Sequence, residues 1–485
     1  MSTPLTLIDF YKADHRSQYP KGTELVFSNW TARGSRIETI DEVVFFGLQY
    51  YVQEYLVDRW NRDFFERPKD EVVDRYARRM HNAGLPIGVE HIEALHDLGY
   101  LPLEIRALPE GTATPIGVPM FVLWNTEPEF FWLTNDLETS ISSVVWGPST
   151  AATIARRYRS ILERWVDATG GDPDFIDWQG HDFSYRGMYG TEAAMLSGAG
   201  HLLSFTGTDT VPAIDFLEDF YAADSDVELV GGSVPATEHS VMSMGTKEDE
   251  LETFHRLITD TYPSGIVSIV SDTWDYWKVW TEYIPALRDD ILARDGVVTI
   301  RPDSGDPVEI LVGDPDAPEG SPEWKGSYQL AWDALGGTVN ERGFKVLDPH
   351  INLIYGDSIT LERCEAICAG LAAKGFVPKN IFGIGSFTYQ HNTRDTFGFA
   401  MKATAGVVEG ELREIFKDPV TDNGTKRSAR GLVAVDRDAD GALRLQDRTT
   451  WEQVEACAFE LVFRDGVVHR TESLGVIRDR VRNAE

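Results

Sequence analysis

Between about residues 200 and 390, short apolar runs alternate with longer patterns of helical period. The runs are rich in β-branched residues, and helical patterns follow at 210–222 and 360–375. This alternation is typical of βα units built around a parallel sheet. We therefore expect strands at HLLSF (201–205), GIVSIVSD (265–272), VVTIRPD (297–303), INLIYGD (351–357) and NIFGIGS (380–386).

The two flanks of this region show a different pattern. The N-terminal flank mixes aromatic-rich strands with helices, and the C-terminal flank carries short alternating runs separated by turn residues. We expect an α/β protein in which a βα barrel-like domain over 151–392 is combined with a second, α+β domain. That second domain is predicted to form from residues 1–150 and 393–485 together.

Each predicted strand in the central region ends in polar or glycine-bearing residues. The carboxyl ends of strands in βα folds face a common side, where binding and catalytic groups collect. The strand ends should therefore converge in space. They carry Asp209 in GTDT, Asp272, Arg301 with Asp303, Gly356 with Asp357, and Gly385 with Ser386.

The stretch TIRPDSGDP at 299–307 has the densest chemistry of these strand ends. Arg301 offers a planar set of donors for a phosphate, carboxylate or amide, and Asp303 suits a metal or a ribose hydroxyl. With Asp272 at another strand end, two carboxylates are available for an oxygen-liganded Mg²⁺ ion. Each aspartate also fits the simpler role of capping a helix.

Glycines follow two of the strands, in IYGDS (354–358) and FGIGSF (382–387). A glycine after a strand lets backbone N–H groups approach a phosphate, although the same pattern is common in ordinary turns. Neither stretch is a GxGxxG dinucleotide motif, and the sequence contains no GxxxxGK[ST] motif.

Two further clusters carry different chemistry. GHDFSYRGMYG at 180–190 contains Phe183 and Arg186, which suit a flat polar ring, although a buried aromatic cluster is the simpler interpretation. VPATEHSVMS at 234–243 places Glu238 beside His239, where a packed or exposed histidine is the simpler interpretation.

The composition narrows the class of protein. The 485 residues are 42% hydrophobic and 25% charged, as in an ordinary globular protein, but the formal net charge is -33. Such acidity argues against binding to nucleic acid or to an anionic membrane surface. The three cysteines form no CxxC motif, and the N-terminus lacks the pattern of a secretion signal. We expect a cytoplasmic protein with reduced thiols.

Taken in order, the motifs show that the chain resembles the nicotinamide phosphoribosyltransferase family. The resemblance covers most of the chain and is more specific than any single motif. It runs through DFYKADHRSQYP (9–20), HDFSYRG, GTDTV, VPATEHS, VSIVSD, RPDSGDP, YGD, FGIGSF and NTRD to FKDPVTD (416–422).

The resemblance implies a type II phosphoribosyltransferase fold and a homodimer with shared active sites. Its substrates would be nicotinamide and phosphoribosyl pyrophosphate, and its products nicotinamide mononucleotide and pyrophosphate, as part of NAD salvage. Phe183 and the partner subunit's Tyr11 would stack on the two faces of the nicotinamide ring, and Asp209 would accept a hydrogen bond from the carboxamide. Arg186, Ser268 and Arg301 would lie near the ring and the ribose phosphate.

The resemblance also implies that ATP, as a coupled substrate, phosphorylates His239. From adjacency alone, we expect Glu238 to orient this imidazole. Asp272 and Asp303 would lie at Mg²⁺, the pyrophosphate and the ribose. The remaining matches concern phosphates. Gly356, Asp357, Gly385 and Ser386 match the ribose-phosphate site, and Arg33, Arg394, Lys402 and Lys417 match a basic set at the dimer interface.

The chain departs from the family pattern at GIGSF, where relatives have a run of glycines and this chain has Ser386 and Phe387. The departure resembles the bacterial and phage branch. Three alternatives remain open: a nicotinate phosphoribosyltransferase, a sugar-phosphate lyase or aldolase on a βα barrel, and a scaffold that retains the pocket. Schiff-base chemistry in a lyase needs a lysine at a strand end, where this chain has Asp, Arg and Gly.

Overall fold

The computed structural model describes residues 3–417 and 429–483. Residues 418–422 of the FKDPVTD motif therefore lie outside the described residues. The chain divides into two compact units. The first consists of Met1–Thr153, Phe216–Ala223 and Asn392–Glu485, and the second of Ile154–Asp215 and Asp224–His391.

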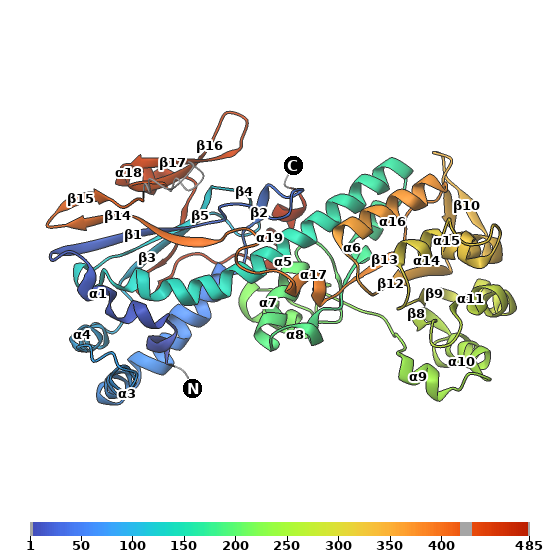
Figure 1. Ribbon diagram of the computed structural model, residues 1–485, viewed down its shortest axis with the longest axis horizontal. Helices are drawn as coiled ribbons and strands as arrows, with labels where there is room; N and C mark the ends of the chain where they lie inside the picture. Colours follow the sequence, from blue (N-terminus) through green and yellow to red (C-terminus); the bar gives the residue numbers. More distant parts are fainter. Residues whose placement is uncertain (1–2, 418–428, 484–485) are drawn as a thin grey trace. The chain divides into compact units, whose positions relative to one another are not determined.

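The first unit is built on a seven-stranded antiparallel sheet with the order β15-β14-β1-β5-β3-β18-β19. Its three central strands come from the N-terminal segment and the two strands on each side from the C-terminal segment, and Figure 1 shows the blue β1 beside the orange β14. This confirms an α+β domain formed by both terminal segments. The strands are β1 (Thr23–Thr31), β3 (Leu103–Ala107), β5 (Pro119–Asn125), β14 (Ala400–Val408), β15 (Glu411–Glu414), β18 (Glu460–Arg464) and β19 (Val467–Val468).

Aromatic side chains fill the core beneath this sheet. Trp30 of β1 is fully buried and stacks on Phe121 of β5 and on Phe399. The first unit also contains two small antiparallel sheets of two strands each: β2 (Glu42–Val44) with β4 (Ala113–Pro115), and β16 (Leu432–Arg437) with β17 (Leu443–Thr449). The principal helices are η2 (Phe10–Asp14), α1 (His15–Gln18), η3 (Tyr51–Arg59), α3 (Lys69–Asn82), α4 (Glu90–Leu98), α18 (Trp451–Ala456) and α19 (Leu474–Arg482).

The second unit contains a six-stranded parallel sheet with the order β7-β6-β13-β12-β9-β8. Four of the predicted strands are confirmed, as β8, β9, β12 and β13. The strands are β6 (Gly180–Asp182), β7 (Gly207–Thr208), β8 (Ser264–Val270), β9 (Asp295–Arg301), β12 (Ile351–Tyr355) and β13 (Ile381–Ile384).

The predicted strand at 201–205 is wrong. Helix α7 (Thr191–His201) ends there, and the apolar run is a buried turn that leads into β7. The imidazole of His201 holds this turn through the Gly207 carbonyl at 3.0 Å and the Tyr389 hydroxyl at 2.6 Å. The apolar character of the run therefore reflects burial in a turn and carries no information about strand pairing.

Helices surround the parallel sheet, and Figure 1 shows several of them beside β9, β12 and β13. They include α8 (Pro212–Tyr221), whose last residues belong to the first unit, and α5 (Leu133–Thr169), which begins in the first unit and ends in the second. The others include α9 (His239–Met244), α14 (Pro307–Val312), α15 (Pro322–Leu335), α16 (Leu361–Ala373) and α17 (Ser386–Gln390).

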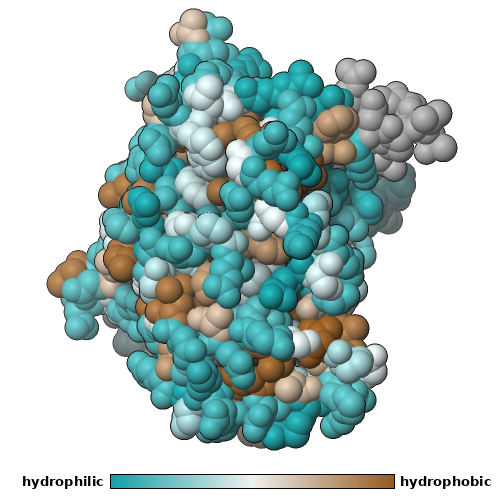
Figure 2. Space-filling view, turned by 90° about the vertical axis from the view of Figure 1, so that its left-hand side faces the viewer, coloured by the Kyte–Doolittle hydropathy of each residue, from teal (hydrophilic) through white to brown (hydrophobic). Residues whose placement is uncertain are grey.

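The polar surface and the free thiols match what the high charge and the low cysteine content of the sequence predict. The face drawn in Figure 2 is largely hydrophilic, with hydrophobic residues in scattered groups. Cys364 and Cys368 are buried on α16, and Cys457 is partly exposed; all three are free thiols. Among the described helices, none is both long enough and apolar enough to cross a membrane.

Candidate active site

The parallel strands of the second unit enclose a cavity of about 300 Å³. Its walls are mostly apolar and extend along the strands, from Ile351 and Ile381 at amino ends to Arg301 at a carboxyl end. Such a pocket suits a flat ring that carries a polar substituent. The polar residues at its wall include the predicted Asp209, Ser268 and Arg301, together with His181 and Ser233; Phe183 and Ile266 are among the apolar ones.

Asp209, directly after β7, is the anionic group of the cavity. Its Oδ1 atom lies 2.9 Å from Nε2 of His181 and accepts a hydrogen bond from the Ser233 hydroxyl at 2.8 Å. Burial alone would raise the pKa of Asp209. The His181 and Ser233 contacts and the charge of Arg301 outweigh that effect, so the pKa lies below its usual value. The side chain is therefore an ionised acceptor at neutral pH.

Ser268 and Arg301 supply donors to the same cavity. The Ser268 hydroxyl is buried and has no hydrogen-bond partner among the described residues, and the same is true of Arg301 Nε. Arg301 is held in place by its Nη2 atom, which donates to the Thr237 carbonyl at 2.6 Å. The cavity thus offers one anionic acceptor and unsatisfied donors, which is the complement of a carboxamide.

Phe183 lies against the backbone of the neighbouring strands, because glycines leave space for its ring. A methyl group at Gly383 would lie 2.5 Å from this ring, and one at Gly356 would lie 3.0 Å from it. The same position at Gly356 is 3.5 Å from Oδ1 of Asp303. The predicted ring-stacking residue, the glycine after β12 and the Asp303 carboxylate are therefore close neighbours.

Asp272, Asp303 and His239 form a second group at the strand ends. Nε2 of His239 lies 3.8 Å from Oδ1 of Asp272 and 3.8 Å from Oδ2 of Asp303. The Asp272 side chain is 4% exposed, and its Oδ2 atom accepts hydrogen bonds from the Asp303 backbone N–H at 2.9 Å and the Ser304 hydroxyl at 2.6 Å. Asp272 therefore fixes the turn that presents Asp303.

The expected role of Glu238 is wrong. Its carboxylate accepts a hydrogen bond from Ser240, whereas Nδ1 of His239 lies 3.1 Å from the Thr273 hydroxyl. Sequence adjacency misled the prediction, because neighbouring side chains at the start of a helix point in different directions. Thr273 stands next to Asp272, so the residue that holds the imidazole belongs to the segment after β8.

The donor set fits Mg²⁺ when a phosphate ligand completes the coordination. Oδ1 of Asp272 is buried without a hydrogen-bond partner among the described residues, and Asp303 is 43% exposed and faces the same point. The described residues contain no group of three or more His, Cys, Asp or Glu side chains arranged around one metal position. Mg²⁺ commonly uses one or two carboxylates, with water and substrate oxygens as the other ligands.

The remaining predicted residues of this unit lie around these two groups. Ser386 begins α17, and its hydroxyl occupies the space over Gly187, where a methyl group would lie 2.0 Å from it. This contact places Arg186, which is exposed in η7 (Tyr185–Gly187), beside the start of α17. Gly385 immediately precedes α17, and the exposed Asp357 accepts a hydrogen bond from Ser358 at 2.9 Å.

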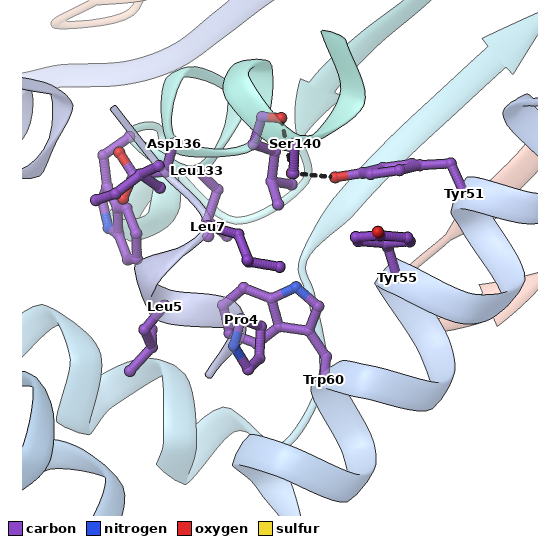
Figure 3. Close-up of a pocket in the computed structure, with 12 residues that line it drawn as sticks. Pro4, Leu5, Leu7, Tyr51, Tyr55, Trp60, Leu133, Asp136 and Ser140 are labelled. Atoms are coloured by element: carbon purple, nitrogen blue, oxygen red, sulfur yellow. Dashed lines mark hydrogen bonds between the residues drawn. The ribbon is translucent and has the colours of Figure 1, made fainter. Parts of the chain in front are cut away.

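Tyr11 belongs to the first unit, where it lies on η2 with its ring 63% exposed. The chain before it is partly buried and lines a small pocket. Figure 3 shows Leu7 between Leu133 and Trp60 at this pocket, and the Tyr51 hydroxyl lies 2.6 Å from that of Ser140. An exposed aromatic ring on an anchored segment is suited to contact another molecule.

The predicted basic set also belongs to the first unit. Burial lowers the pKa of Lys402, and the positive charges of Arg33, Lys417 and Arg394 lower it further, while Glu138 opposes them. Arg33, Lys417 and Arg394 therefore lie within electrostatic reach of Lys402. In a strongly acidic protein these four residues are a local concentration of positive charge.

Three polar partners were not predicted: His181, Ser233 and Thr273. His181 stands in the motif that contains Phe183, and Ser233 directly precedes VPATEHS. Their position at or just after parallel strands was the available signal, since side chains there line a common edge.

Comparisons with protein families give two matches. Residues 178–456 match the model of the "Nicotinate phosphoribosyltransferase (NAPRTase) family", and residues 4–105 match "Nicotinamide phosphoribosyltransferase, N-terminal domain". The first match includes the cavity and both groups of strand-end residues. The second includes Tyr11 and Arg33.

Individual relatives agree with these matches. The chain is 53% identical to a nicotinamide phosphoribosyltransferase of Acinetobacter baylyi, over 99% of this chain and 97% of the relative. It is 33% identical to one from Xanthomonas campestris pv. campestris, over 89% and 86% of the two chains. Among solved structures, a Pyrococcus furiosus nicotinate-nucleotide pyrophosphorylase has a TM-score of 0.55 at 13% identity, covering 99% and 95%. Human nicotinic acid phosphoribosyltransferase has a TM-score of 0.54 at 17% identity, covering 98% and 92%.

Proposed function

Because this chain belongs to the nicotinate phosphoribosyltransferase family, and within it to the nicotinamide phosphoribosyltransferases, we propose that it makes nicotinamide mononucleotide and pyrophosphate. Its substrates are nicotinamide and phosphoribosyl pyrophosphate, and its role is in NAD salvage. The fold is the type II phosphoribosyltransferase fold that the resemblance predicted.

The observation that carries the choice of nicotinamide is the ionised Asp209 in the cavity. A carboxamide nitrogen donates to this carboxylate, while its carbonyl oxygen accepts from the unsatisfied donors of Ser268 and Arg301. A nicotinate ring places a negative carboxylate at the same point and is repelled. Phe183 provides one face for the ring, and Tyr11 of the partner subunit provides the other.

The reaction is a displacement at the anomeric carbon of the ribose. The bond between this carbon and pyrophosphate breaks, and a bond to the pyridine nitrogen forms. The nitrogen carries no proton, so no general base is needed, and the residues contribute by positioning and charge stabilisation. Asp272 and Asp303 would hold Mg²⁺, which when bound neutralises charge on the leaving pyrophosphate.

Phosphate groups are held at two places in this proposal. The backbone around Gly356 and Gly385, with Asp357 and Ser386, receives the ribose phosphate. Arg186 and Arg301 approach from the ring side. The cationic set in the first unit binds phosphates across the interface of a homodimer; its members are Arg33, Arg394, Lys402 and Lys417.

ATP hydrolysis is coupled to this synthesis through His239. When Nδ1–H donates to the Thr273 hydroxyl, Nε2 keeps the lone pair that attacks the terminal phosphorus of ATP. The bond between that phosphorus and the ADP oxygen breaks, and ADP leaves. Water later hydrolyses the phosphohistidine. Asp272 and Asp303 face Nε2, so a Mg²⁺ ion that they held would supply charge neutralisation for a phosphate at this point.

We place the enzyme in the cytoplasm, as its reduced thiols suggest, and assign it no nucleic-acid or membrane partner because of its acidity. The test is an assay of purified protein with phosphoribosyl pyrophosphate and Mg²⁺, offering nicotinamide and nicotinic acid in parallel, each with and without ATP. Product from nicotinamide supports the proposal. Product from nicotinic acid alone would assign the nicotinate reaction to this chain. It would also mean that Asp209 does not face the substituent on the ring.

A further inference from the structure

The unexpected feature of the cavity is that both hydrogen-bond donors to Asp209 reach the same carboxylate oxygen. We propose that His181 and Ser233 are specificity-determining positioning residues: they saturate Oδ1 of Asp209 and leave Oδ2 as the single acceptor for a carboxamide N–H. The inference rests on the proposed function and adds two residues to it. Neither residue is required to contact the ring.

The two contacts also show which atoms carry the protons of these hydrogen bonds. His181 Nε2 lies 2.9 Å from Oδ1, and the Ser233 hydroxyl oxygen lies 2.8 Å from the same atom. An ionised carboxylate only accepts, so Nε2 of His181 carries a proton and the serine hydroxyl points toward Oδ1. Among the residues that the structure describes, no hydrogen bond reaches Oδ2 of Asp209. The side chain is 51% exposed, so Oδ2 is accessible from the cavity.

Backbone pairing holds all three side chains in this relation. β6 and β7 are parallel neighbours, with His181 opposite Gly207, and the Asp209 N–H donates to the Asp182 carbonyl at 2.9 Å. Gly232, the residue before Ser233, bridges Gly207 from the other side. The arrangement therefore depends on strand positions that are far apart in sequence and fixed in space.

The imidazole of His181 is also confined. The residue is 7% exposed, and a methyl group at Gly207 would lie 2.7 Å from its Nδ1 atom. The ring lies against Gly207 on one side and against Phe183 on another, at a centroid distance of 4.9 Å. A ring packed in this way presents Nε2 to Asp209 without rotating away, which lowers the entropic cost of keeping the contact.

The two hydrogen bonds to Oδ1 bear on the discrimination between nicotinamide and nicotinate. Two donors on Oδ1 favour the ionised form of Asp209 and hold the carboxylate in one orientation, so it stays charged when the ring arrives. The titratable or charged groups that act on Asp209 are His181 from β6 and Arg301 from β9. Arg301 attracts either substrate, so discrimination against nicotinate depends on Asp209 remaining ionised and correctly oriented.

The test compares Ser233→Ala and His181→Phe, which remove one donor each, with Ser233→Thr and His181→Gln, which keep a donor. The measurement is kcat and KM for nicotinamide and nicotinate, together with the KM for phosphoribosyl pyrophosphate. Hydrogen bonds to charged groups are worth about 1.5–3 kcal/mol, so each removal should lower the nicotinamide-to-nicotinate ratio of kcat/KM by about tenfold or more. The KM for phosphoribosyl pyrophosphate should change less than about twofold, within the effect of a remote substitution.

A pH profile separates this role from a merely structural one. Removing a donor raises the pKa of Asp209, so the acidic limb of kcat/KM for nicotinamide should move to higher pH in Ser233→Ala and return in Ser233→Thr. An unchanged substrate ratio and acidic limb in both donor-removing variants would overturn the inference while leaving the proposed function intact. Wild-type protein that converts only nicotinate would instead overturn the proposed function.

Discussion

The ammonium group of Lys12 lies 2.6 Å from the Glu138 carboxylate, and the Lys12 side chain is 3% exposed. A lysine is rarely buried this fully without a partner. The pair joins η2 to α5, and a second contact nearby, between Thr139 and the Asp9 carboxylate at 2.7 Å, reinforces it. Tyr11 lies between these two attachment points with its ring exposed. The Lys12–Glu138 and Asp9–Thr139 contacts together form a clamp on either side of Tyr11. This clamp presents the tyrosine that we assign to the partner subunit's site.

Breaking the clamp from one side should destabilise the first unit. We expect Lys12→Met to lower the free energy of unfolding by about 2–3 kcal/mol, because it leaves Glu138 partly buried and unpaired. Glu138→Leu in the same chain should recover most of that loss, since two apolar side chains replace the pair. Urea unfolding of the two single variants and the double variant measures the coupling. Additive losses would show that the two charges do not act as a pair.

The metal proposal predicts a strong effect of Asp303. Asp303→Ala should reduce kcat by at least about a hundredfold, because it removes a group that positions charge at the leaving pyrophosphate. Asp295→Ala, at the opposite end of β9, is the matched control. Excess chelator should abolish wild-type turnover, and added Mg²⁺ should restore it. A folded Asp303→Ala variant with turnover within a few-fold of wild type would contradict the mechanism.

The coupling proposal predicts that Thr273 matters and Glu238 does not. His239→Ala should abolish both stimulation by ATP and acid-labile phosphate on the protein, while nicotinamide mononucleotide still forms slowly without ATP. Thr273→Val should lower the rate of phosphorylation about tenfold, since it removes a hydrogen bond that orients the imidazole. Glu238→Gln serves as the control. Loss of phosphorylation in Glu238→Gln, with normal phosphorylation in Thr273→Val, would reverse the assignment.

Periodicity predicted the parts of the fold that have long apolar runs. Strand β12 and the later residues of β8 and β9 are buried, and all three strands are rich in β-branched residues, so the pattern identifies them. Strand β6 consists of Gly180, His181 and Asp182, which carry no apolar signal. Its place in the sheet follows from parallel pairing with β13 and β7, which no local pattern reveals.

For the candidate active site, too, local sequence patterns revealed only part of the arrangement. Residue types at strand ends predicted the cavity lining, but the partners of those residues depend on contacts distant in sequence. Asp209 meets His181 and Ser233, 28 and 24 residues away, whereas Glu238 does not orient the adjacent His239. Sequence neighbours were therefore poor guides to hydrogen bonding, and strand neighbours were good ones.

Ser386, at the point where this chain departs from its family, fills the space over Gly187. We therefore expect a substitution at Ser386 to compensate for one at Gly187. Gly187→Ala should lower kcat/KM for phosphoribosyl pyrophosphate about tenfold, because the new methyl group meets the Ser386 side chain and forces η7 away from α17. Adding Ser386→Gly vacates that space and should restore much of the activity. A double variant as impaired as Gly187→Ala would show that the contact is not the cause. Thermal unfolding of each variant checks that both are folded.

Glu110 of the first unit is a buried acid whose protonation should set the pH dependence of stability. It is 3% exposed, and burial raises its pKa to about 7, with the Glu472 charge adding to the effect. The Gln49 N–H at 2.8 Å and the Tyr221 hydroxyl at 3.0 Å oppose the rise. In the unfolded chain the pKa returns to about 4.5.

The direction of the pH effect follows from these two values. Between pH 4.5 and 7 the folded protein holds a proton on Glu110 that the unfolded chain has lost, so stability falls as pH rises through this range. The loss is about 1.4 kcal/mol per pH unit, or about 3 kcal/mol in all. Glu110→Gln keeps one acceptor and one donor and removes the titration. The stability of wild type relative to this variant should therefore fall by about 3 kcal/mol from pH 4.5 to pH 8, as measured by urea unfolding.

Glu66→Gln, at an exposed position, is the control, and its curve of stability against pH should stay parallel to that of wild type. A parallel curve for Glu110→Gln as well would mean that Glu110 is ionised in the folded protein across this range.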